Sequence, residues 1–226
     1  RVVNSRPELL MKSSLTWPVY WLLHIWVLAY CGVLLGAFTL RRAFTDSLQW
    51  PNLRVAVNVS ARQLRNGDFA DLAEKVLRET GAEARRIELE ITESLFMDVS
   101  ELVQSHLRAA IEMGVSLSID DFGTGYSCLA TLKDIPASKL KLDRAFVAPL
   151  PEDRRVFAVV KAITQMGREL GMTVVAEGVE NKAQLDMLES AGVDAIQGFL
   201  HARPMNEDEL VGWLLRQHQH LTGTPA

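Results

Sequence analysis

Cysteine is scarce in this sequence, and positive charge is not in excess. The two cysteines, Cys31 and Cys128, match neither a disulfide framework nor a zinc ligand set, which points to a reducing, cytoplasmic compartment. The chain has 24 Lys and Arg residues against 28 Asp and Glu, a formal net charge of −4. No overall basic surface is left for binding long nucleic acid by counterion release, so we exclude that class of partner.

Low-complexity segments and long linkers are also absent. The 226 residues are 48% apolar and 23% charged, which is a globular composition and not that of a disordered, collagenous or disulfide-stapled chain. This length suits one barrel-sized or sandwich-sized domain. We therefore expect a single domain over residues 1–226.

Charged residues are missing altogether from Ser13 to Thr39. The stretch is long enough to span a bilayer, which would attach the protein to a membrane there or through an upstream segment. Lys12 precedes it and Arg41 and Arg42 follow it, so the flanking charges give no orientation, and no signal-peptide cleavage site is present. A transmembrane helix, a buried pair of core helices and a locally corrupted or frame-shifted stretch are three open interpretations.

Beyond this stretch, one unit repeats: a short apolar run, a polar loop, and an amphipathic stretch that ends in glycine. The runs predict parallel strands at 55–59, 87–91, 115–119, 140–142, 173–176 and 195–196. Apolar residues at helical spacing predict helices around 69–77, 102–111 and 156–163. At least six such units suit a closed (β/α)8 barrel or an open doubly wound sheet. The glycine-rich dinucleotide fingerprint is absent after the first strand, which favours the barrel.

Polar side chains stand at the carboxyl ends of these strands. In a barrel all of those ends open on one face, where several carboxylates would repel one another unless cations neutralise them. Carboxylate and amide oxygens without histidine or cysteine favour Mg²⁺ or Mn²⁺ over zinc, and adjacent aspartates could serve two ions in attack on a phosphate ester. The residues are Asn58, Glu90, Asp120, Asp121, Lys141, Glu177 and Gln197.

Two further features accompany these residues. The turn from Asp121 to Gly125 has two glycines whose backbone N–H groups could approach a ligand oxygen. Glu93 follows the strand of Glu90 on the other face and is expected to orient a loop without contacting metal.

Six short motifs follow one another along the chain. They are Val57-Asn58-Val59-Ser60, Glu88-Leu89-Glu90-Ile91-Thr92-Glu93-Ser94, Asp120-Asp121-Phe122-Gly123-Thr124-Gly125-Tyr126-Ser127, Lys139-Leu140-Lys141-Leu142-Asp143, Ala176-Glu177-Gly178-Val179-Glu180 and Gln197-Gly198-Phe199. In this order they resemble the EAL-domain family of cyclic di-GMP phosphodiesterases. The resemblance covers about Phe38 to Trp213 and implies an α/β, TIM-like (β/α)8 barrel with one reversed strand, well matched over 38–226 and altered or incomplete over the atypical segment 1–37.

This resemblance implies hydrolysis of cyclic di-GMP to linear pGpG with two Mg²⁺ or Mn²⁺ ions, and inhibition by Ca²⁺. It also suggests a homodimer and a sensory domain upstream of residue 1. Lys141 would hold the attacking water, Gln197 would belong to the same network, and Glu93 would support the glycine-rich loop. The implied metal ligands are Asn58, Glu90, Asp120, Asp121 and Glu177, with Glu177 also catalytic, and the implied substrate-binding residues are Gln63, Asp143 and Glu180.

The sequence departs from the family pattern at its amino end. The family's Glu-x-Leu, with a following Arg that contacts phosphate, has one counterpart here, Glu8-Leu9-Leu10-Met11-Lys12. Glu8 would supply the first metal ligand, and Lys12 stands where Arg is usual. Three functions stay open: a phosphodiesterase, a non-catalytic cyclic di-GMP receptor, and an unstable fragment that neither binds nor cuts.

Overall fold

A computed structural model of the chain describes residues 32–50, 52–65, 68–93, 95, 100–125 and 129–222. Glu8 and Lys12, the two site residues expected near the amino end, lie outside this part of the chain. So do residues 13–31 of the charge-free stretch and residues 1–31 of the atypical segment.

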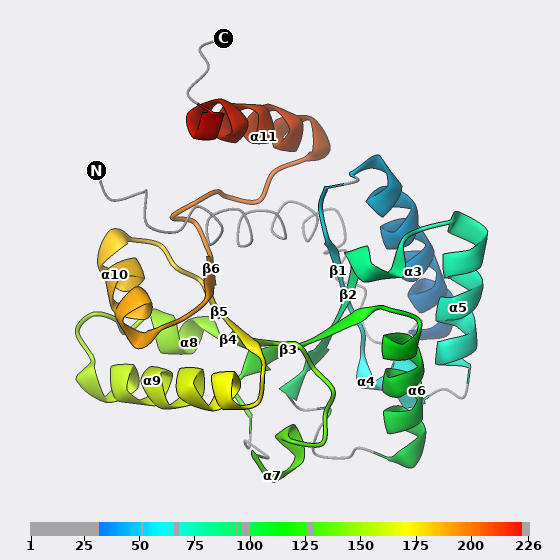
Figure 1. Cartoon of the computed structure of the whole chain (residues 1–226), viewed down its shortest axis with the longest axis horizontal. Helices are drawn as coiled ribbons and strands as arrows, with labels where there is room; N and C mark the ends of the chain where they lie inside the picture. The colour runs from blue at the N-terminus through cyan, green and yellow to red at the C-terminus, as the bar shows by residue number, and fades with distance from the viewer. Residues whose placement is uncertain are drawn as a thin grey trace.

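The centre of the fold is a parallel sheet of six strands whose spatial order equals their sequence order (Figure 1). A doubly wound sheet would reverse that order at a switch point, whereas consecutive barrel strands follow one another. Among the described strands no reversal occurs, as the barrel interpretation predicts. The strands are β1 (Val55–Asn58), β2 (Ile87–Thr92), β3 (Ser116–Phe122), β4 (Lys139–Leu142), β5 (Thr173–Glu177) and β6 (Ala195–Gln197).

Helices flank the sheet in two groups (Figure 1). The first group contacts β1 and β3 through α3 and α6, and the second contacts β5 through α8 and α9. The first consists of α3 (Gly32–Gln49), α4 (Ala61–Arg65), α5 (Phe69–Thr80) and α6 (Glu101–Glu112), the second of α8 (Arg144–Val147), α9 (Arg154–Glu169) and α10 (Lys182–Ala191). The short elements η1 (Ala84–Arg86) and α7 (Leu129–Leu132) and the C-terminal α11 (Glu207–Thr222) complete the order.

Capping residues end and begin these helices where the sequence predicts. Gly81 and Gly192, with φ of 70° and 84°, terminate α5 and α10 in the left-handed conformation that glycine adopts without a Cβ clash. Asn181 and Gln184 form a capping box at the start of α10. Local sequence therefore fixes where these helices stop and start.

Strand alternation separates the core from the barrel interior. Leu89 and Ile91 of β2 belong to the hydrophobic core, while Glu88 and Glu90, also buried, take the intervening positions and face the other side. The amphipathic helices cover the apolar face. The opposite face carries the charged residues that form the site.

The end of the charge-free stretch forms part of α3. Residues 32–39 open this helix, and the following Leu40, Ala43 and Phe44 are fully buried. None of the helices in the described part of the chain is long and apolar enough to cross a bilayer. Residues 32–39 thus begin a helix that packs into the core through the residues that follow them, and the interpretation of residues 13–31 stays open.

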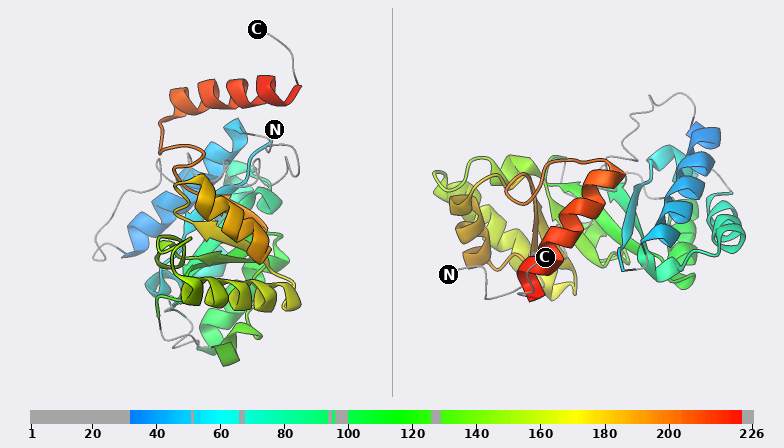
Figure 2. Two further views of the ribbon diagram at one scale, coloured as in Figure 1. Left: turned by 90° about the vertical axis from the view of Figure 1, so that its left-hand side faces the viewer. Right: turned by 90° about the horizontal axis from the view of Figure 1, so that it is seen from above.

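The C-terminal helix α11 lies apart from the sheet in Figure 1 and in the left view of Figure 2. Its Leu210 is buried, whereas Val211 and Leu215 are exposed. At its start, Asn206 and Glu209 exchange the two hydrogen bonds of a capping box, whose three-residue spacing is visible in the sequence.

Candidate active site

The predicted site residues converge at the carboxyl edge of the sheet. Asn58, Glu177 and Gln197 are the last residues of β1, β5 and β6. Strand register pairs Asn58 with Glu90 and Glu177 with Gln197 across neighbouring strands. Residues far apart in the sequence therefore share one face, which we call the barrel mouth: Asn58, Glu90, Asp120, Asp121, Lys141, Glu177 and Gln197.

Lys141 is the cationic centre of the barrel mouth. Its Nζ lies 2.6 Å from Glu177 Oε1, 2.8 Å from Asp120 Oδ1 and 3.1 Å from Glu90 Oε1. The lysine and Glu90 are almost completely buried, and Asp120 and Glu177 are only slightly exposed. Three strands thus direct carboxylates at one ammonium group.

One lysine does not neutralise this acidic cluster. Burial raises the pKa of Glu90 to about 8, although Lys141 opposes the shift. Burial is also the main cause of the raised pKa values of Glu177 and Asp121, and the neighbouring Asp120 charge raises both further. Burial by itself lowers the pKa of Lys141, but the charges of the surrounding carboxylates outweigh it and hold that pKa well above its usual value.

The donor set fits a hard divalent cation. Asp120, Asp121 and Glu177 each offer a carboxylate oxygen, and these oxygens lie within 4.8 Å of one another. The Oε2 atom of Glu90 is buried and has no hydrogen-bond partner among the described residues. Mg²⁺ and Mn²⁺ prefer oxygen ligands, and a bound cation would lower the carboxylate pKa values that burial raises.

The loop that follows β3 is held from the side of β2. Glu93 is buried, and its Oε2 accepts hydrogen bonds from the backbone N–H groups of Gly123 at 2.7 Å and Gly125 at 3.3 Å. Asp121, near the end of β3, has a φ of 54°, the one positive φ of a described non-glycine residue. The structure therefore places Glu93 against the turn that directly follows Asp121 and Phe122.

The three predicted substrate-binding residues make local contacts at the rim. The Gln63 side chain accepts hydrogen bonds from the Ser60 backbone N–H at 2.9 Å and its hydroxyl at 2.6 Å. Asp143 caps α8 by accepting from the N–H of Ala145 at 2.7 Å. Glu180 is exposed and pairs with Arg144. Their role toward a substrate stays a prediction.

A second buried ion pair was not predicted from the sequence. Lys139 Nζ lies 2.6 Å from Glu88 Oε1, two residues before Lys141 and Glu90 on the same two strands. Because side chains alternate along a strand, this pair shares the interior face but lies further from the carboxyl edge. The signal was a glutamate between Ile87 and Leu89, inside an otherwise apolar run.

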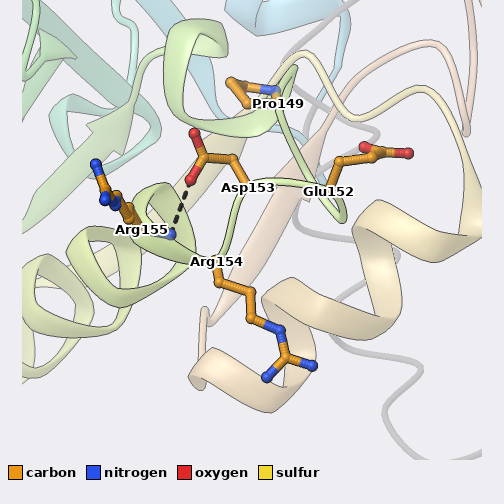
Figure 3. A pocket seen from close by; sticks show the side chains of 5 residues that line it. All are labelled: Pro149, Glu152, Asp153, Arg154 and Arg155. Carbon is orange, nitrogen blue, oxygen red and sulfur yellow. Dashed lines mark hydrogen bonds between the residues drawn. The ribbon is translucent and has the colours of Figure 1, made fainter.

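A separate pocket lies where α9 begins (Figure 3) and contains none of the barrel-mouth residues. The Asp153 carboxylate accepts hydrogen bonds from the N–H groups of Arg155 and Val156, which caps the helix. The side chains of Arg154 and Arg155 point apart in Figure 3. We therefore interpret Asp153 as the N-cap of α9 and assign the pocket no ligand.

Comparison with known proteins identifies relatives of this arrangement. A family model described as EAL domain matches residues 29–204. The bifunctional diguanylate cyclase/cyclic di-GMP phosphodiesterase MucR of Pseudomonas aeruginosa is 44% identical over 160 residues, which is 70% of this chain and 23% of the relative. For five of the curated relatives, the chain spans 21% to 23% of their length.

Solved structures agree with the family match. The PaMucR phosphodiesterase in complex with c-di-GMP has a TM-score of 0.74 and 39% identity, covering 79% of this chain and 74% of that one. The manganese and cyclic di-GMP complex of Klebsiella pneumoniae BlrP1 has a TM-score of 0.72 and 29% identity, covering 79% of this chain and 46% of that one. These likenesses confirm the predicted α/β, TIM-like fold, and the chain belongs to the EAL domain family.

Proposed function

We propose that the chain is a phosphodiesterase that hydrolyses cyclic di-GMP to linear pGpG with the help of two divalent metal ions. The observation that carries this proposal is the buried cluster in which Lys141 contacts Glu90, Asp120 and Glu177. Support comes from MucR, which is named a cyclic di-GMP phosphodiesterase, and from the PaMucR complex with c-di-GMP.

The barrel-mouth oxygens would hold the ions. The Asp120 carboxylate lies beside those of Asp121 and Glu177, and these three residues together with Asn58 and Glu90 would hold the ions. Bound Mg²⁺ or Mn²⁺ supplies positive charge to the phosphate oxygens and lowers the pKa of a water molecule. The protein itself supplies too little positive charge to neutralise these carboxylates, which is why this face would take up cations.

Lys141 has a separate role in the proposed reaction. Its raised pKa keeps the ammonium group protonated at neutral pH, so it acts as a fixed donor that holds the attacking water. The water oxygen bonds to phosphorus and gives up a proton as the P–O3′ bond breaks, and the leaving O3′ takes up a proton, so the net reaction adds one water molecule. The product keeps a 5′-phosphate and a 3′-hydroxyl, which defines linear pGpG.

Two measurements on the 226-residue chain test this function. The first is hydrolysis of cyclic di-GMP with Mg²⁺ or Mn²⁺, followed by separation of pGpG from substrate; the second is a binding titration with Ca²⁺ in place of these ions. The proposal expects turnover in the first and binding without turnover in the second. Binding of cyclic di-GMP with Ca²⁺ but no hydrolysis with Mg²⁺ or Mn²⁺ identifies a receptor instead, and Asp120→Asn serves as the inactive control.

A further inference from the structure

The short helix α8 packs against the turn that follows Asp121 at the end of β3. A Cβ atom placed on Gly123 would lie 2.2 Å from Cε2 and 2.5 Å from Cζ of Phe146, so the Phe146 ring fills the space beside the Gly123 backbone. Gly123 has a φ of 96°, which glycine adopts at little cost. Gly123 and Phe146 therefore form one close contact between the turn after β3 and α8.

This contact and the Glu93 hydrogen bonds involve the same glycine. Glu93 accepts from the N–H of Gly123, and the Phe146 ring lies where a Gly123 side chain would project. The neighbouring Asp121 has a positive φ, a conformation that costs a non-glycine residue free energy and persists when its surroundings enforce it. The surroundings that can hold Asp121 in this conformation are the Glu93 carboxylate and the Phe146 ring, which both contact Gly123.

The same helix also contacts the loop after Glu177. A Cβ on Gly178 would lie 2.5 Å from Cγ of Arg144, and the Arg144 guanidinium pairs with Glu180 Oε1 at 2.7 Å. α8 thus contacts the loops of two of the three carboxylates in the metal-binding cluster. It starts three residues after Lys141 on the same segment, so it connects the cationic centre to both loops.

We propose that Phe146 is a positioning residue, whose ring holds residues 121–125 in the conformation that presents Asp121 to a divalent cation. This proposal rests on the proposed function, because it assigns Asp121 to a metal site. In this proposal the ring acts through its contact with Gly123 and the backbone of residues 121–125.

Hydrogen exchange on the metal-free 226-residue chain tests the contact directly. In Phe146→Ala the amides of Gly123 and Gly125 are expected to exchange about tenfold faster, while those of Val174 and Val175 in β5 keep the rate of the parent chain. Phe146→Leu, which keeps an apolar side chain, is expected to restore most of the protection. Phe157→Ala is the matched control, because Phe157 is also half-buried against the core but lies in α9.

The same four proteins are then titrated with Mn²⁺ by calorimetry. Phe146→Ala is expected to weaken Mn²⁺ binding about tenfold, and Phe157→Ala to leave it unchanged. Unchanged exchange at Gly123 and Gly125 overturns the proposal, and so does faster exchange with unchanged Mn²⁺ affinity. A parent chain that binds no Mn²⁺ contradicts the proposed function instead, while the exchange rates still decide whether Phe146 holds the loop. If Phe146→Ala does not fold, Phe146→Leu carries both measurements, with a smaller effect in the same direction expected.

Discussion

The ammonium group of Lys141 donates a hydrogen bond to Oδ1 of Asp120 at 2.8 Å, between the neighbouring strands β4 and β3. Both residues were predicted as site residues from their positions at strand ends. Their contact joins the residue proposed to hold the attacking water to a carboxylate proposed to hold metal.

Lys141→Met is expected to lower kcat by about 10² to 10⁴ while KM changes little, because a residue that positions water acts mainly in the transition state. Steady-state kinetics with Mg²⁺ provide both constants. Lys139→Met is the control. It removes a positive charge from the same face of β4, but that lysine pairs with Glu88 and not with the barrel-mouth carboxylates. An equal loss of turnover and affinity in Lys141→Met would make this lysine a phosphate-binding residue.

Asp120→Asn is expected to abolish hydrolysis without unfolding the chain. The substitution removes a ligand charge but preserves side-chain volume, and it takes away one of the mutually repelling carboxylates. The melting temperature of the metal-free variant should therefore equal or exceed that of the parent chain. Undiminished turnover in this variant would disprove the metal-site assignment.

The stability of the metal-free chain is expected to fall as pH rises from about 5 to 8. The folded-state pKa of Glu90 is raised to about 8 from the usual value of 4.5, so in this window the folded chain binds a proton that the unfolded chain has released. The stabilising contribution is complete below the unfolded pKa and is lost as pH approaches 8. Glu90→Gln has no such proton, so its melting temperature should fall less steeply between pH 5 and 8 in EDTA. Parallel curves for the two proteins would show that Glu90 ionises normally.

Glu8→Gln tests the prediction that Glu8 supplies the first metal ligand. Glu8 lies outside the described residues, so the structure does not place it. If Glu8 completes the ligand set, as the family resemblance implies, this variant loses Mg²⁺-dependent hydrolysis and keeps the parent melting temperature. Glu152→Gln, a change at an exposed glutamate, is the control. Full turnover by Glu8→Gln would show that catalysis proceeds without this carboxylate.

Most residues that the structure brings to the barrel mouth could be named from the sequence, because strand ends are local features. Periodicity places Glu90, Asp120 and Lys141 near the end of each apolar run, and the geometry of parallel strands brings these ends to one edge. Helix ends were predictable for a similar reason, as at Gly81 and Asn181, where capping depends on residues a few positions apart.

The sequence alone determined the order of strands and helices, the helix caps and the list of oxygen donors, because each depends on residues close together in the chain. Tertiary structure decided which carboxylates share Lys141, how far burial raises the pKa of Glu90, and that Lys139 pairs with Glu88. It also decided that Phe146 packs beside Gly123. These outcomes depend on desolvation and on contacts between separate strands and loops. No local pattern of residues determines how close two side chains from different strands come or how completely water is excluded from them.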